Sequence, residues 1–123
     1  MTLPLTPDML AAAYEFLRTT PPFCRWALPE ADYVTFRVLN SNQDYGAYHY
    51  SAGSHTIDCS CKMVGHTETL MSLMGHEMIH MRLAITGKEY KNIKAKPTVH
   101  NAAFNKYASQ VCRVHGFDPK AFY

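Results

Sequence analysis

Residues 70–82 read LMSLMGHEMIHMR and contain His76, Glu77 and His80 in the pattern H-E-x-x-H. An α-helix turns about 100° per residue, so two histidines four positions apart lie one turn above each other on one face. Both imidazoles can then bind the same tetrahedral ion, and zinc is the ion that this pattern indicates. Glu77 follows His76 directly, where its carboxylate can accept a proton from a metal-bound water.

The residues around this motif are apolar on nearly every face of the expected helix, which is typical of a helix buried among other elements. Unpaired polar groups in such a place cost several kcal/mol. The three polar side chains must therefore be satisfied, either by a hydrogen-bonded structural cluster or by a metal ion, and the motif favours the metal. The apolar residues are Leu70, Leu73, Met74, Met78, Ile79, Met81, Leu83 and Ile85.

A catalytic zinc needs a third protein ligand and one open position. The downstream candidates are Glu89, His100, His115 and Asp118. We favour His100, because it stands at the start of a second stretch, residues 99–112, in which apolar residues recur at helical spacing.

The positions of His100 and His115 along the chain decide which of them can be the third ligand. The connection over residues 87–97 can span up to about 33 Å when extended, which is enough to bring His100 back beside His80. His115 lies about 22 Å further along the same helix and cannot share a metal with His100. We interpret His115, just before Gly116, as a favourable charge at a helix C-terminus.

The segment Gly75-His76-Glu77-Met-Ile-His80, followed about twenty residues later by His100-Asn101-Ala-Ala-Phe104, resembles the SprT-like zinc metalloprotease family with its Spartan-type protease domain. In that family the third zinc ligand opens an H-G-x-x-F segment on the next helix. The resemblance implies zinc on His76, His80 and His100, with Glu77 as the catalytic base and acid. It covers roughly residues 46–114, and Asn101 stands where the family usually has glycine.

The length of 123 residues predicts a single domain over residues 1–123. We expect an α+β fold, which the resemblance makes a minimal gluzincin-like zincin. It should have an N-terminal helix, a small three-stranded antiparallel or mixed sheet, the active-site helix and a C-terminal helix carrying the third ligand. The first helix should begin with Thr6 as N-cap and Pro7 at its first position, and end at residues 19–22.

Three segments have the alternating pattern of strands, residues 33–39, 45–50 and 55–61, and the last two form a hairpin around residues 51–54. In the third strand His55, Ile57, Cys59 and Cys61 should share one face. The resemblance to zincins implies that this third strand is the sheet edge along which an extended peptide lies. An edge strand binds a peptide backbone by strand addition, so sequence preference should be weak.

The four cysteines do not suggest a second metal site. No C-x-x-C pair exists to complete a four-ligand zinc with Cys59 and Cys61, so we expect reduced thiols and no C-terminal zinc ribbon. The chain has no run of eighteen apolar residues and no export signal pattern, so we expect no membrane contact and a cytoplasmic protein. Disulfides are not expected in that compartment.

Charge is uneven along the chain. Residues 1–80 hold four Lys and Arg against eight Asp and Glu, whereas residues 81–123 hold eight against two. The basic residues of 82–120 could contact DNA or a DNA-bound protein, and the alternative is a solvated lysine loop. They are Arg82, Lys88, Lys91, Lys94, Lys96, Lys106, Arg113 and Lys120.

These observations predict a zinc-dependent metallopeptidase, a hydrolase acting on a polypeptide with Glu77 as general base and acid. One alternative is a small zinc-stabilised domain that binds nucleic acid without catalysis, which would need a fourth protein ligand. A second is a hydrolase with a substrate other than a polypeptide. Candidates for stabilising the oxyanion are Tyr48, Tyr50, Tyr90 and Tyr107, without ranking.

Overall fold

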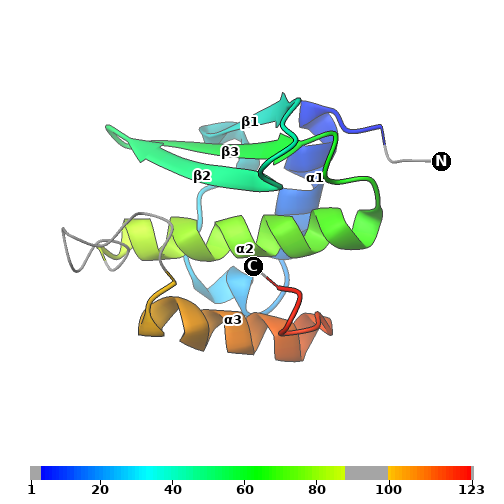
Figure 1. Ribbon diagram of the computed structural model, residues 1–123. Helices are drawn as coiled ribbons and strands as arrows, with labels where there is room; N and C mark the ends of the chain where they lie inside the picture. The colour runs from blue at the N-terminus through cyan, green and yellow to red at the C-terminus, as the bar shows by residue number, and fades with distance from the viewer. Residues whose placement is uncertain (1–3, 88–99, 123) are drawn as a thin grey trace.

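The computed structural model describes residues 4–87 and 100–122, and these form an α+β fold of three α-helices and a three-stranded sheet (Figure 1). The expectations placed on Lys88, Glu89, Tyr90, Lys91, Lys94 and Lys96 lie outside the described residues. The elements in chain order are α1 (Pro7–Arg18), η1 (Phe23–Arg25), η2 (Ala31–Tyr33), β1 (Val34–Leu39), β2 (Gly46–Ser51), β3 (Ser54–Ser60), α2 (Thr67–Ile85) and α3 (Ala102–His115).

Helix α1 begins and ends as its sequence predicts. Thr6 is the N-cap, and its side chain accepts a hydrogen bond from the Met9 amide at 3.2 Å, so one unpaired donor of the first turn is satisfied. The face formed by Leu10, Tyr14 and Leu17 is fully buried against the rest of the protein. This face anchors α1 to α2 and to β1.

The sheet is mixed and has the strand order β1-β3-β2. Strand β3 pairs in parallel with β1, from Val34 opposite His55 to Leu39 opposite Ser60, and antiparallel with β2 in the expected hairpin. The expectation that β3 is the edge strand is therefore wrong, because both of its sides are already paired. Among the described residues, the edge strand that packs against α2 is β2.

Helix α2 occupies the middle of the molecule, between the sheet and α3 (Figure 1). The close approach of β2 to α2 depends on Gly46, because a Cβ there would meet the Asp58 carbonyl oxygen and come within 2.9 Å of a Leu73 methyl group. Beyond α3 the chain turns back toward α2, and the Phe122 side chain is buried there. Strand β2 and the segment after α3 therefore both lie next to α2, the helix that carries His76 and His80.

Two general findings concern the described part of the chain. None of its helices is long and apolar enough to cross a membrane. All four cysteines are free thiols, with Cys59 and Cys112 buried and Cys24 and Cys61 exposed.

Candidate metal centre

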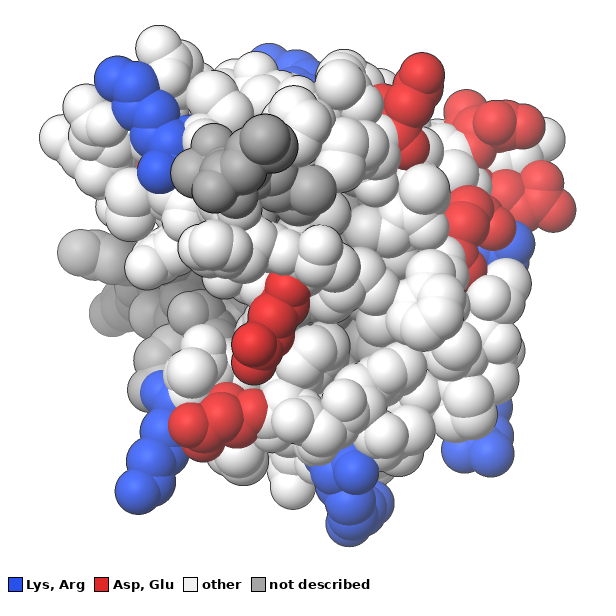
Figure 2. Space-filling model, turned by 90° about the vertical axis from the view of Figure 1, so that its right-hand side faces the viewer, with Lys and Arg blue, Asp and Glu red and all other residues white. Residues whose placement is uncertain are grey.

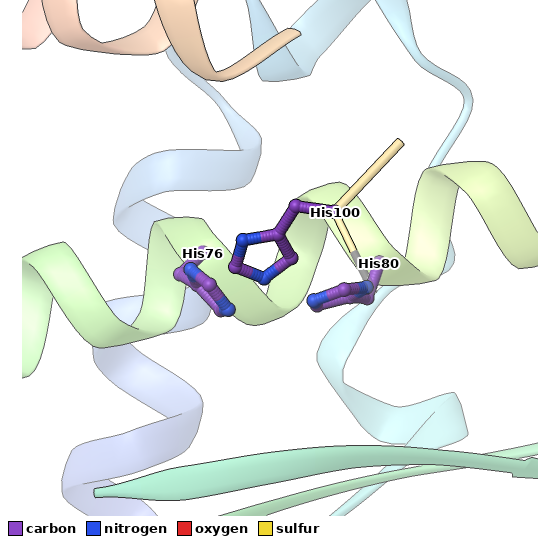
Figure 3. Close-up of side chains that lie close together, drawn as sticks. All are labelled: His76, His80 and His100. Atoms are coloured by element: carbon purple, nitrogen blue, oxygen red, sulfur yellow. The ribbon is translucent and has the colours of Figure 1, made fainter. Parts of the chain in front are cut away.

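Three histidines converge on one point beside α2. The ligand nitrogens available on His76, His80 and His100 all lie within 4.8 Å of one another. The ring centroids are 4.8–5.3 Å apart in all three pairs. Figure 3 shows the three imidazoles turned toward a common space, two of them from α2 and one from the segment that leads into α3.

The helical period of α2 alone places two of these candidate ligands, His76 and His80, on one face. His76 and His80 lie one turn apart and are 8% and 7% exposed, and Glu77 between them is 4% exposed. The helix is apolar around them, as its sequence predicts, so these three are its only buried polar side chains within the described residues. The Nδ1 atom of His76 is buried and has no hydrogen-bond partner.

The position of His100 is determined by the start of the next helix, α3. Asn101 is the N-cap of α3, and its side-chain oxygen accepts a hydrogen bond from the Phe104 amide at 2.8 Å. The Phe104 ring stacks on His100 with centroids 3.9 Å apart and an interplanar angle of 6°. It also lies 5.0 Å from the ring of His76 and 4.8 Å from that of His80. Asn101, where the SprT-like pattern has glycine, thus acts as a helix cap.

Phe104 is the main site residue whose role the helical spacing did not reveal. Sequence reasoning counted it among the apolar residues of a helix, whereas it packs against all three candidate ligands. The available signal was the spacing of His100 and Phe104 in the SprT-like pattern, because His100 precedes the N-cap of α3 and lies outside the helix.

Burial favours the neutral form of His76 and His100, which is the form that binds metal. Burial, together with a smaller effect of the nearby His80 and His100, lowers the pKa of His76 to about 3. Burial also lowers the pKa of His100, again with a contribution from His80. Both shifts favour the neutral imidazole at these two candidate ligand positions.

Glu77 lies on the side of α2 that faces the sheet. Burial, together with smaller effects of the nearby Glu77 carboxylate and Cys61, raises the pKa of the Cys59 thiol to about 12. Because Cys59 is buried on β3, opposite Gly46 of β2, the Glu77 carboxyl group lies near the centre of the sheet.

The donor set fits a zinc ion with one open position. Zinc binds imidazole nitrogens at about 2.0–2.1 Å, so tetrahedral ligands lie about 3.3 Å apart and small ring movements would close the observed spacing. A structural zinc takes four protein ligands, and no fourth His, Cys, Asp or Glu of the described residues joins the three. Nitrogen ligands also suit other divalent transition metals, so the geometry supports a metal site without fixing the metal.

The other candidate ligands lie elsewhere or outside the described residues. The His115 Nε2 is 3.2 Å from the Thr20 hydroxyl, at the C-terminal end of α3 as expected. The Asp118 carboxylate accepts a hydrogen bond from the Lys120 amide at 3.0 Å. Glu89 is not described.

A cleft of about 410 Å³ opens beside His76, between the first half of α2, the residue before β2 and the segment after α3. Sequence reasoning did not anticipate this cleft, since two of its walls come from segments without periodic patterns. Its lining consists of Tyr45, Glu68, Thr69, Ser72, Leu73, His76, Phe117, Asp118 and Ala121.

The tyrosines named for oxyanion stabilisation have different surroundings. The Tyr48 hydroxyl is 2.6 Å from His55 Nδ1 on the inner face of the sheet, and Tyr50 is about half exposed on β2. Tyr107 packs its ring against Trp26 at 4.8 Å, which gives it a place in the core. Tyr90 is outside the described residues.

Comparison with models of known protein families gives no match for this chain, and a search of curated proteins finds no relative.

Proposed function

We propose that this protein is a zinc-dependent metallopeptidase of the SprT-like type. The observation that supports the proposal best is the convergence of His76, His80 and His100 beside the buried Glu77. Three imidazole ligands and an adjacent carboxylate are the residue set of a catalytic zinc site. The free thiols suit a reducing compartment, and we propose the cytoplasm.

In this proposal each polar residue of the site has one role in peptide hydrolysis. Zinc, when bound, supplies a Lewis acid that makes water nucleophilic near neutral pH and polarises the scissile carbonyl. His76, His80 and His100 are the residues that would hold it. Glu77 takes the proton of the attacking water and passes it to the leaving amine.

A polypeptide substrate is favoured by the free edge of β2. This strand runs alongside the part of α2 that carries the histidines (Figure 3), and its outer edge has no strand partner among the described residues. An extended peptide can add to such an edge through backbone hydrogen bonds. A substrate of another class would be better served by a deep, closed pocket than by a cleft beside an open edge.

The alternative of a nucleic-acid-binding domain with a structural zinc has less support. It needs a fourth ligand, which the described residues do not supply. Arg82 donates a hydrogen bond to the Trp26 carbonyl at 2.7 Å, so this cation is used within the fold. Lys106 and Arg113 remain exposed on α3 and Lys120 lies beyond it, and contact of these residues with DNA or a DNA-bound protein stays a proposal.

The test replaces Glu77 by Gln and measures zinc content and hydrolysis of an unfolded protein such as denatured casein. We expect about one zinc per chain in both proteins and a loss of hydrolysis by about 100-fold or more in the variant, because the general base is gone. Glu30→Gln, which changes an exposed carboxylate, is the matched control. Hydrolysis near the wild-type rate in Glu77→Gln would refute the assigned role of Glu77. Zinc in both proteins without hydrolysis by either would favour the binding-domain alternative.

A further inference from the structure

The cleft beside His76 contains charged residues that are not among the candidate metal ligands. Two carboxylates, Glu68 and Asp118, line it, and neither Lys nor Arg is among its described lining residues. Figure 2 shows the end of the molecule at which α2 begins, with carboxylates in the lower middle and at the upper right, and with Lys and Arg mostly toward the margins. This distribution differs from the basic character of the C-terminal third of the sequence.

We propose that this cleft binds a Lys or Arg side chain of the polypeptide substrate, on the C-terminal side of the scissile bond. The inference rests on the proposed peptidase function and names the class of substrate that the same site prefers.

The cleft is a cavity with walls of its own, in addition to the two carboxylates on its surface. Its volume of about 410 Å³ has room for a long side chain. Leu73, Phe117 and Ala121 offer apolar surface for an aliphatic stem, and the two carboxylates can accept hydrogen bonds from a cationic head group. His76, only 8% exposed and with an unpartnered Nδ1, forms part of the same wall. A substrate in the cleft therefore contacts a candidate ligand residue of the metal centre.

The period of α2 fixes how far the acidic part of the cleft lies from the metal centre. Glu68, Ser72 and His76 are on successive turns of one helical face, and eight residues of helix span about 12 Å. An extended peptide advances about 3.3 Å per residue. The side chain that reaches Glu68 should therefore belong to a residue within about three positions of the scissile bond.

The direction of β2 decides which side of that bond is involved. Gly46 at the start of β2 lies against Leu73, and the strand then runs toward the C-terminal end of α2 (Figure 1). A peptide that adds antiparallel to β2, the more stable pairing, runs the opposite way. Its residues after the scissile bond then pass the first half of α2, where the cleft is.

Both carboxylates also have local roles that a test must preserve. Glu68 lies in the first turn of α2, where a negative charge is favourable, and Asp118 accepts the Lys120 amide hydrogen bond. The substitutions Glu68→Gln and Asp118→Asn remove the charges but keep the shape, and the Asn side chain can still accept that hydrogen bond. Asp32→Asn, at an exposed position away from the cleft lining, is the matched control.

The experiment measures peptide binding without turnover. Zinc-loaded Glu77→Gln protein is titrated against two fluorescein-labelled peptides that differ only in one Lys or its uncharged analogue norleucine, and fluorescence polarisation is read. We expect the Lys peptide to bind about five- to twenty-fold more tightly at low salt. Adding Glu68→Gln and Asp118→Asn should reduce this ratio to about twofold or less, whereas adding Asp32→Asn should leave it unchanged. Mass spectrometry of wild-type cleavage products should place Lys or Arg within three residues after the cut.

The outcomes separate this inference from the proposed function. A Lys preference that survives removal of both carboxylates overturns the inference, as do cleavage sites with basic residues only before the cut. Hydrolysis can be intact in either case, and the peptidase proposal then stands. A Lys preference that depends on the carboxylates without any hydrolysis by the wild type supports a cation-binding cleft and overturns the peptidase proposal. Absence of binding by either peptide overturns the inference.

Discussion

His100 is the residue on which the metal centre most depends beyond the motif itself, and His115 provides its matched control. Both are histidines of the same segment, but only His100 lies with His76 and His80. We expect His100→Ala to lower zinc content to well below half an ion per chain, because two ligands from one helix make a weak site. His115→Ala should keep about one. The measurement is elemental mass spectrometry after dialysis, and equal zinc in the two variants would remove His100 from the ligand set.

A second residue-scale prediction concerns Asp58 on the outer face of the sheet. Arg37 donates two hydrogen bonds to its carboxylate, at 2.7 and 2.8 Å, and His49 Nε2 is 2.9 Å away. Burial alone would raise the pKa of this carboxyl group, but the hydrogen bonds from Arg37 and His49 outweigh burial and hold the pKa below its ordinary value.

The sign of the pH effect follows from this shift. Folded Asp58 binds fewer protons than unfolded Asp58, so its contribution to stability is present above about pH 4 and is lost as the pH falls below that value. Asp58→Asn should cost about 1–3 kcal/mol at pH 7 and make the free energy of unfolding less dependent on pH below about 4. Urea unfolding between pH 2.5 and 7 measures both effects, with Asp32→Asn as the control. Identical acid dependence in wild type and Asp58→Asn would contradict the assignment.

Among the elements, the contact between β2 and α2 is the one on which substrate binding would depend, and two glycines test it. A Cβ at Gly46 would meet backbone and the side chain of Leu73, whereas a Cβ at Gly75 would make ordinary contacts of 3.4 Å or more with aromatic rings. We expect Gly46→Ala to lower the free energy of unfolding by about 1–3 kcal/mol. Gly75→Ala should be neutral or stabilise by up to about 1 kcal/mol, because Ala favours the helix. Thermal and urea unfolding compare the two, and an unaffected Gly46→Ala would mean that the strand can move away from the helix.

Most elements could be predicted from the sequence because they have local causes. Thr6 and Pro7 predict the start of α1, the alternation in each strand predicts its two faces, and the four-residue spacing of His76 and His80 predicts their convergence. His100 joins them from a distant part of the chain, as the resemblance implied. Its stacking on Phe104 could not be read from helical spacing alone.

The order of the strands could not be predicted, because alternation describes one strand and carries no information about its neighbours. The parallel pairing of β1 with β3 is not local, and it places β3 in the centre. One consequence is visible in Asp58, which is 2% exposed although its strand face looks polar. Side chains from both flanking strands cover it, and the same register gives His49 a partner that the sequence alone did not suggest.

At the scale of the whole molecule, metal binding should stabilise the fold, because the three candidate ligands belong to two separate segments. A ligand at one hundred times its Kd adds about 2.7 kcal/mol, which for a domain of this size raises Tm by roughly 10 °C. We expect zinc added to chelator-treated protein to give a shift of that order, and magnesium, which prefers oxygen ligands, to give almost none. Differential scanning fluorimetry is sufficient. A shift that is undiminished in His100→Ala would show that zinc binds elsewhere.

The separation of His80 and His100 along the chain has a further consequence in terms of polymer statistics. An ion held by both would act as a reversible cross-link, and closing a loop of this length restricts the unfolded chain by on the order of 3 kcal/mol. That contribution changes only with the logarithm of loop length, so ten added residues would alter it by only about 0.4 kcal/mol. The entropy of cross-linking therefore places almost no constraint on the length of the connection between His80 and His100. Any constraint on that length would have to come from what the connection itself contacts.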